Sequence, residues 1–142
     1  MIVPDVNVLL YAHVDAFLEH DRARTWWEET LSAGRPVGLA PVVVFGFIRI
    51  ATSRRVLTRP FSVQQAQAVV ESWLAQPGVQ ILESGREHLG RTLEVLTGVG
   101  TAAALTTDAQ IAAHAFIEGA AVATHDTDFG RFADLDVVDP VR

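Results

Sequence analysis

The stretch TTDAQIAAHAFIEGAAVATHDTDFGRF, residues 106–132, decides how this chain folds. Residues 107–119 repeat apolar residues at helical spacing and end in glycine, which predicts a helix followed by a turn. The run AAVAT, residues 120–124, is short, apolar and bounded by Gly and Asp, which is typical of a buried strand. Acidic residues stand at the ends of this unit, because Asp108 begins the helix and Asp126 and Asp128 follow the strand.

The same alternation of strands and helices runs through the rest of the chain. Further strands are predicted at residues 1–4, 36–40, 78–82 and 136–138, and further helices at residues 19–33, 41–53, 62–76 and 86–98. Ser62 followed by Gln65 predicts a capping box at one helix start. Alternating elements of this kind form a parallel sheet covered by helices. We therefore predict an α/β/α sandwich around a mostly parallel sheet of four to five strands, with residues 1–142 as a single domain.

Composition limits the functions that fit. The 142 residues carry a net charge of −6 and contain no cysteine, which excludes a disulfide framework and a thiolate metal site. No signal peptide or membrane-spanning run is evident, so we expect a cytoplasmic protein with no membrane partner. An acidic chain has no general affinity for nucleic acid, so any such contact must be local. The segment SRRVLTRP, which gathers Arg54, Arg55 and Arg59 without an acidic residue, is the candidate.

A further acidic residue comes from the start of the chain. The stretch MIVPDVNVLL, residues 1–10, places Asp5 directly after an apolar strand. Ligands of parallel sheets bind at the carboxyl ends of the strands, so Asp5 should lie near Asp126 and Asp128, with Asp108 arriving from a helix. Each of these residues also suits a helix N-cap, but together their like charges need a cation. Oxygen ligands without cysteine favour Mg²⁺, with Mn²⁺ able to substitute.

Three segments together resemble a PIN-domain protein of the VapC toxin type: MIVPDVNVLL, FIRIAT and residues 106–132. The resemblance covers nearly the whole chain. It implies a PIN-like α/β/α sandwich, a homodimer, and a divalent-metal-dependent endoribonuclease that cleaves RNA, usually tRNA. It also implies a VapB-type antitoxin as partner, which covers the active site with a peptide and alone contacts operator DNA.

The resemblance assigns roles to individual residues. It makes Asp5, Asp108 and Asp126 the catalytic acids and principal metal ligands, and Asp128 a further metal ligand, directly or through water. It assigns supporting roles to Asn7 and Thr124. Charge, rather than the resemblance, makes Arg49 and the cluster of Arg54, Arg55 and Arg59 candidates for binding flanking RNA phosphates. A metal held by carboxylates lowers the pKa of a bound water and polarises the phosphate, so no covalent protein nucleophile is needed.

One position departs from the family pattern. Such proteins commonly carry a Glu three residues before the Arg that corresponds to Arg49, and here that place is Gly46. No Asp or Glu occurs between Glu29 and Glu71, so no neighbour substitutes for it. We expect water to fill the vacated coordination position, since Mg²⁺ usually retains several waters. A Glu restored at this position should then tighten the binding of Mg²⁺.

Two alternatives stay open from the sequence. With Gly46 in place of the acid, the chain is also compatible with a catalytically weak PIN-fold module that binds RNA or antitoxin. The motif DVNVL also resembles the strand end of a haloacid-dehalogenase-like phosphatase, in which the first Asp is the nucleophile. The absence of lysine, and Asn7 in place of the second acid, argue against this phosphatase.

Overall fold

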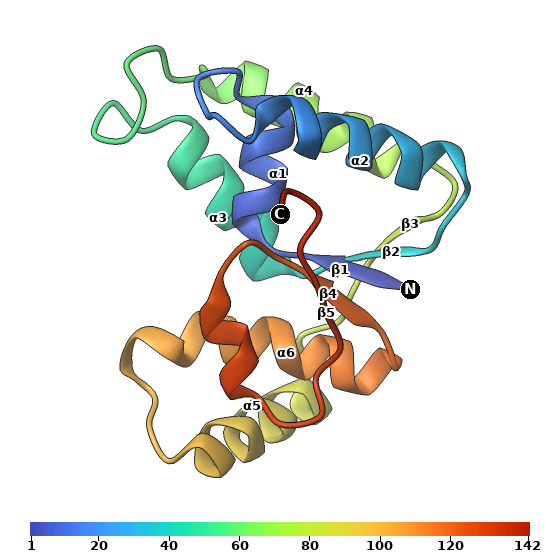
Figure 1. The fold of residues 1–142 in the computed structure, drawn as a ribbon, viewed down its shortest axis with the longest axis vertical. Coiled ribbons are helices and arrows are strands. Elements are labelled where there is room, and N and C mark those ends of the chain that lie inside the picture. Colours follow the sequence, from blue (N-terminus) through green and yellow to red (C-terminus); the bar gives the residue numbers. More distant parts are fainter.

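The computed structural model describes all of residues 1–142 and contains a five-stranded sheet (Figure 1). The strands are β1 (Ile2–Pro4), β2 (Val37–Leu39), β3 (Val79–Ile81), β4 (Ala121–Ala123) and β5 (Val137–Val138). They lie in the order β3-β2-β1-β4-β5, and every neighbouring pair is parallel. The predicted α/β fold with a parallel sheet is confirmed, at the upper end of the expected strand number.

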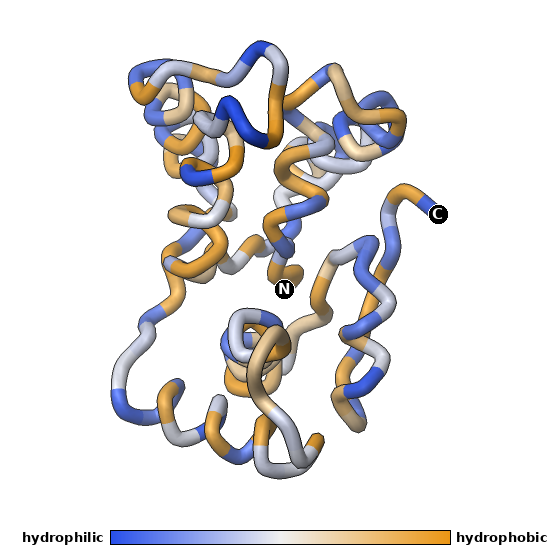
Figure 2. Tube along the Cα trace, turned by 90° about the vertical axis from the view of Figure 1, so that its left-hand side faces the viewer, coloured by the Kyte–Doolittle hydropathy of each residue, from blue (hydrophilic) through white to orange (hydrophobic).

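Helices cover the sheet on both faces. They are α1 (Val6–His13), α2 (His20–Ser32), α3 (Pro41–Ala51), α4 (Val63–Leu74), α5 (Arg86–Val99) and α6 (Thr106–Glu118), with 3₁₀ turns η1 (Ala103–Leu105) and η2 (Thr127–Arg131). The helices α1 to α4 form one layer, and α5 and α6 lie on the other side of the sheet (Figure 1), a division that is also visible from the side in Figure 2. None of these helices has the length and apolar character needed to cross a membrane.

The sequence missed one helix, α1. Its eight residues, VNVLLYAH, are apolar at most positions and show no clear helical period, so no element was predicted after the strand at residues 1–4. The side chain of Asp5 caps this helix, because its Oδ1 accepts a hydrogen bond from the backbone N–H of Val6 at 2.6 Å. The chain therefore turns from strand to helix at the first acidic residue.

The predicted helix ends are confirmed. The Ser62 hydroxyl accepts from the N–H of Gln65 at 3.1 Å, and the Gln65 side chain accepts from the N–H of Ser62 at 2.8 Å, which completes the capping box of α4. Gly119 ends α6 with a φ of +60°, a conformation that side chains disfavour. This turn sends the chain directly into β4.

An aromatic cluster holds the first helical layer together. Phe47 of α3 and Trp73 of α4 meet edge to face with ring centroids 4.8 Å apart, and both are almost completely buried. The indole N–H of Trp73 donates to Nε2 of His13 at 3.1 Å, so the polar atom of this buried ring has a partner. Through these contacts the cluster packs α1, α3 and α4 against one another.

Phe47→Ala should lower the free energy of unfolding by about 3–5 kcal/mol, because it removes a fully buried aromatic ring and leaves a cavity. Phe45→Ala is the matched control on the same helix, since the Phe45 side chain is 69% exposed and its loss should change stability by less than about 0.5 kcal/mol. Urea denaturation measures both values. Equal losses in the two variants would contradict this description of α3.

Candidate metal centre

The topology brings the ends of β1 and β4 together at the centre of the sheet. These strands are neighbours, and Pro4 is paired with Ala123 at their carboxyl ends. From β1 the chain proceeds toward β2 on one side, whereas β4 and β5 lie on the other, so the strand order reverses here. Ligands of open parallel sheets bind at such a switch point. Asp5 and Thr124, the next residues of the two strands, therefore lie side by side.

Hydrogen bonds hold Asp5 and its neighbours in one arrangement. Oδ2 of Asp5 accepts from the hydroxyl of Thr124 at 2.8 Å and from the side-chain amide of Asn7 at 3.0 Å. The Thr124 hydroxyl also accepts from the N–H of Asp126 at 3.0 Å. Burial raises the pKa of the Asp5 carboxyl above its ordinary value, and the hydrogen bonds from Thr124 and Val6 partly offset this effect. Asn7 and Thr124 thus occupy the supporting positions expected of them.

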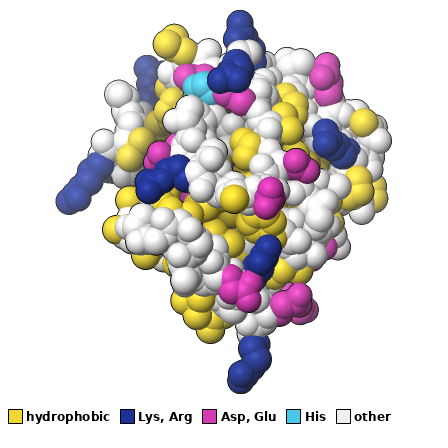
Figure 3. All heavy atoms as spheres, turned by 60° about the horizontal axis from the view of Figure 1, so that its bottom comes forward, with side chains coloured by type: hydrophobic (Ala, Val, Ile, Leu, Met, Phe, Trp, Pro, Cys, Tyr) yellow, Lys and Arg dark blue, Asp and Glu magenta, His cyan; other side chains and the backbone are white.

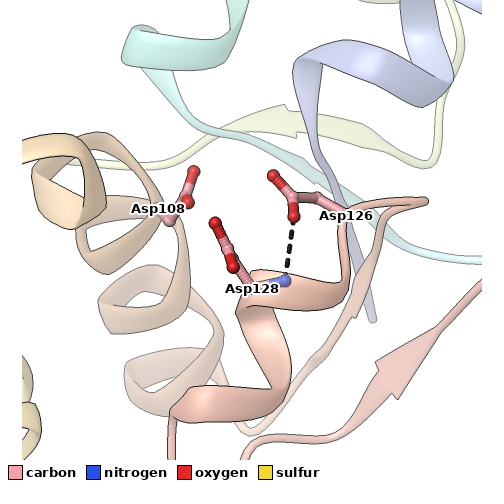
Figure 4. Close-up of side chains that lie close together, drawn as sticks. All are labelled: Asp108, Asp126 and Asp128. Atoms are coloured by element: carbon pink, nitrogen blue, oxygen red, sulfur yellow. Dashed lines mark hydrogen bonds between the residues drawn. The ribbon is translucent and has the colours of Figure 1, made fainter.

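Three other carboxylates converge beside this network. Carboxylate oxygens of Asp108, Asp126 and Asp128 all lie within 4.8 Å of one another. Figure 4 shows the three side chains pointing toward one another, with Asp108 on α6 and the other two at the start of η2. Oδ1 of Asp126 accepts from the N–H of Asp128 at 2.8 Å, which sets the spacing of this pair. We refer to Asp108, Asp126 and Asp128 as the acidic trio.

The charge of the acidic trio is not neutralised by the protein. No arginine forms an ion pair with any of the three residues, and no protein donor binds the carboxylates of Asp108 or Asp128. Burial, followed by the negative charges of Asp5, Asp126 and Asp128, raises the pKa of Asp108 to about 6. Closely spaced carboxylates with free oxygens suit a hard divalent cation, so these residues fit the metal that the sequence implies.

The structure differs from the sequence-based grouping in the places of Asp5 and Asp128. Asp128 was expected at the margin of the site, but it lies within the acidic trio. Asp5 was expected among the principal ligands, yet both of its oxygens accept hydrogen bonds from the protein and its exposed fraction is 7%. Its negative charge nevertheless acts on Asp108. Which of these carboxylates bind a metal stays a prediction.

The predicted arginines do not lie against the acidic trio. Arg49 is exposed on α3, and Arg54, Arg55 and Arg59 are exposed in the segment between α3 and α4. Arg59 lines a cavity of about 610 Å³ between this segment and the α1–α2 connection, and no residue of the acidic trio lines it. None of these arginines forms an ion pair with the acidic trio, so the structure does not make them part of the carboxylate cluster.

Sequence reasoning missed an acidic residue at the same edge. Asp139 follows β5 directly, and its Oδ2 lies 2.9 Å from Nδ1 of His125. The strand-end rule that identified Asp5 and Asp126 applies equally to Asp139. The run DVVDP, residues 136–140, predicted the strand, but the Asp that follows this strand was not considered as a site residue.

Gly46 lies against α1 rather than against solvent. A Cβ atom at this position would approach Cγ2 of Val6 to 2.9 Å, closer than carbon atoms normally pack. Val6 directly follows Asp5 and is β-branched, so its methyl groups have little freedom to turn away. The Val6 side chain therefore already lies against the place where the usual family acid would begin, and a glutamate there requires movement of Val6.

Asp108→Asn should stabilise the metal-free protein at neutral pH. The raised pKa means that the folded chain binds the Asp108 proton more tightly than the unfolded chain, so this residue lowers wild-type stability as the pH rises from 3.8 to about 6. The variant avoids this loss, and its Tm advantage should be near zero at pH 4 and about 3 °C at pH 7. Thermal unfolding in EDTA measures it, with Glu118→Gln on the exposed end of α6 as control. An unchanged Tm at pH 7 would contradict the raised pKa of Asp108.

Gly46→Ala should lower the free energy of unfolding by about 1 kcal/mol, because overpacking against Val6 exceeds the gain in helix propensity. In a Val6→Ala background the same change should be neutral or favourable, since the obstructing methyl groups are gone. A double-mutant cycle in urea measures this coupling, and additive effects would show that the contact is unimportant. The Val6→Ala background is also the one in which Gly46→Glu tests whether the restored family acid tightens Mg²⁺ binding.

Comparisons with known proteins agree with this geometry. Residues 2–135 match the family model described as PIN domain. Ribonuclease VapC33 of Mycobacterium tuberculosis is 47% identical over 142 residues, which cover 100% of this chain and 99% of that protein. Ribonuclease VapC37 of the same species is 36% identical over 132 residues, or 93% of this chain and 92% of that protein.

A comparison with solved structures finds the same fold. The structure of DNA-bound VapBC from Salmonella typhimurium superimposes with a TM-score of 0.71 at 18% sequence identity, and the match covers 98% of this chain and 97% of that chain. At this identity the similarity concerns the fold, whereas the sequence relatives define the group. The chain therefore belongs to the PIN-domain family and, within it, to the VapC ribonuclease toxins of toxin–antitoxin systems.

Proposed function

We propose that this chain is a divalent-metal-dependent endoribonuclease, and that the acidic trio together with Asp5 forms its active site. The observation that carries the proposal is the convergence of three carboxylates within 4.8 Å without a neutralising cationic side chain. Such a cluster is costly unless a cation binds it. The family membership supplies the reaction class, which is hydrolysis of RNA phosphodiester bonds.

The residues of the site would have two roles, holding the cation and positioning the residues that hold it. Asp108, Asp126 and Asp128 would hold the cation, and Asp5 would either join them or hold their supports in place through Thr124 and Asn7. When bound, the cation supplies positive charge against the scissile phosphate and a lowered pKa for water. With this chemistry supplied by the cation, the carboxylates would serve to hold it, and no serine, cysteine or histidine nucleophile would be required.

Mg²⁺ is the proposed ion, with Mn²⁺ as a substitute. Both prefer carboxylate and water oxygen, and the acidic trio offers oxygen ligands alone. The absence of cysteine and the carboxylate ligand set make zinc a poor fit. Gly46 leaves the site without an acid from α3, so water would complete the coordination of the metal.

The proposed substrate is RNA, with tRNA as the target class. The chain has a net charge of −6, so affinity must come from the metal and from local cationic groups. Arg49 and the exposed arginines Arg54, Arg55 and Arg59 supply such groups on and beside α3. Arginine suits this role because its planar fork donates two hydrogen bonds to phosphate oxygens.

The proposed partners are a VapB-type antitoxin and a second copy of the chain. The Salmonella relative is a VapBC assembly bound to DNA, and we propose that this chain likewise meets operator DNA through its antitoxin. Exposed apolar side chains offer a surface for such association, since Leu89 and Leu93 on α5 are 61% and 56% exposed. Figure 3 shows hydrophobic side chains gathered on the face that α5 helps to form. We place this complex in the cytoplasm, with residues 1–142 forming a single domain.

A second candidate function is a PIN-fold module that binds RNA or antitoxin but cleaves slowly. The observation that favours it is Gly46, where Val6 lies against the place of the usual acid. The haloacid-dehalogenase-like alternative has lost its support, because the chain belongs to the PIN-domain family.

Purified, antitoxin-free protein should cleave total RNA or tRNA into discrete fragments with Mg²⁺ or Mn²⁺. Cleavage should disappear in EDTA and fall by at least about 100-fold in Asp108→Ala, because the metal would lose one of its holders. Glu118→Ala, on the exposed end of the same helix, is the matched control and should retain full activity. Gel analysis of fragment ends measures cleavage. Folded protein that cleaves nothing with either metal would favour the binding module.

A further inference from the structure

A cavity of about 300 Å³ opens next to the acidic trio, at the carboxyl ends of β4 and β5. Asp126 lines the cavity and is also a member of the acidic trio. A molecule in the cavity would therefore lie directly beside the proposed metal position. The side chains that matter for its chemistry are His125, Thr127, Asp139 and Arg142. None of them was assigned a role from the sequence or by the proposed reaction.

The chain end that builds one wall of the cavity is anchored to the rest of the fold. Oδ1 of Asp139 accepts from the N–H of Val141 at 3.1 Å, which closes a tight turn after β5. Arg22 of α2 donates to the carbonyl oxygen of Val141 at 3.3 Å, and the Val141 side chain is buried. Asp139 and Arg142 therefore sit on a segment with fixed contacts.

The surroundings of His125 define which of its nitrogen atoms is free. Its Nδ1 lies 2.9 Å from Oδ2 of Asp139, and an ionised carboxylate can only accept a hydrogen bond, so Nδ1 carries a proton. In the neutral ring Nε2 is then an acceptor. No protein group binds Nε2, and the side chain is 40% exposed at the cavity. An edge-to-face contact with Tyr11, at 6.2 Å between ring centroids, further limits the position of the ring.

The cavity therefore offers two kinds of contact. Arg142 and the hydroxyl of Thr127 are exposed donors, which suit phosphate oxygens. Nε2 of His125 is an acceptor, which suits a hydroxyl group. A ribonucleotide presents both partners within one unit, namely its phosphate and its 2′-hydroxyl. DNA lacks the hydroxyl. A peptide can offer a backbone N–H to Nε2, but it lacks a phosphate and a hydroxyl at the fixed spacing of one nucleotide.

We propose that this cavity is a ribonucleotide subsite, which rests on the proposed ribonuclease function. It binds the nucleotide flanking the scissile phosphate, with Arg142 and Thr127 on its phosphate and His125 accepting from its 2′-hydroxyl. Asp139 acts as a positioning residue, because it holds the His125 ring through Nδ1. Water-based hydrolysis has no chemical need for the 2′-hydroxyl, so this contact gives the site its preference for RNA over DNA.

The first test measures binding without cleavage. The Asp108→Asn protein is titrated with a fluorescent single-stranded RNA and with DNA of the same sequence in Mg²⁺. RNA should bind about fivefold more tightly than DNA, the size of one hydrogen bond, and His125→Phe should remove this difference while keeping a ring against Tyr11. Arg142→Gln should weaken RNA and DNA equally, whereas Arg35→Gln, an exposed arginine before β2, should change neither. A preference for RNA that survives in His125→Phe overturns the proposal.

The second test uses the active protein and an RNA oligonucleotide that contains a mapped cleavage site. A single 2′-deoxy substitution at one of the two flanking nucleotides should lower kcat/KM about fivefold in the wild type and leave it unchanged in His125→Phe. Asp139→Ala should reduce the 2′-deoxy effect as well, because it removes the acceptor that holds Nδ1 of His125. A wild type that cleaves no RNA defeats the proposed function itself, whereas cleavage with an equal 2′-deoxy effect in both proteins defeats only the subsite.

The antitoxin provides the remaining outcome. If His125→Phe and Arg142→Gln leave RNA binding and cleavage unchanged but weaken inhibition by the antitoxin, the cavity belongs to the protein partner and the nucleotide assignment is wrong. If both variants change RNA recognition and the antitoxin inhibits them as it inhibits the wild type, the cavity is a substrate subsite.

Discussion

The parallel pairing of β1 with β4 is the constraint on which the site depends. It places Asp5 beside Thr124, and the Thr124 hydroxyl then joins Asp5 to the backbone of Asp126. Two strand ends that are more than 100 residues apart in the chain become one rigid unit by these contacts. The helices contribute the remaining acid, because the left-handed turn at Gly119 lets α6 run back along β4 with Asp108 at the carboxyl edge.

Hydrogen bonding divides the four carboxylates into two classes. Asp5 is buried, and protein donors satisfy both of its oxygens, which is the ordinary way to stabilise a charge inside a protein. The acidic trio receives almost no such help, and the carboxyl of Asp108 is left with a pKa near 6. The hydrogen bonds fix the position of the Asp5 carboxylate at the site, whereas the unsatisfied charges of the acidic trio mark the place where a ligand is needed.

Much of this could be predicted from the sequence, for physical reasons. Alternating strands and helices predict the parallel sheet, and the strand-end rule then brings Asp5 and Asp126 together. Asp108 begins a helix, and its place at the site was expected mainly from the family resemblance. Helix α1 was missed because a short apolar helix has no visible period. The exact place of Asp128 depends on the turn at η2, and the packing of Gly46 on Val6 depends on a helix crossing; both are three-dimensional facts with no signature in spacing.

The unsatisfied charge of the acidic trio has a consequence for the lifetime of the protein. A ligand that binds the folded state and not the unfolded chain raises stability by mass action, so a cation at the trio adds to folding as well as to chemistry. Chelation would therefore remove catalysis and loosen the fold in one step. Proteases act on the transiently open chain, so the metal-free form would be degraded sooner than the loaded form. Degradation in the cell would then leave a higher proportion of metal-loaded molecules.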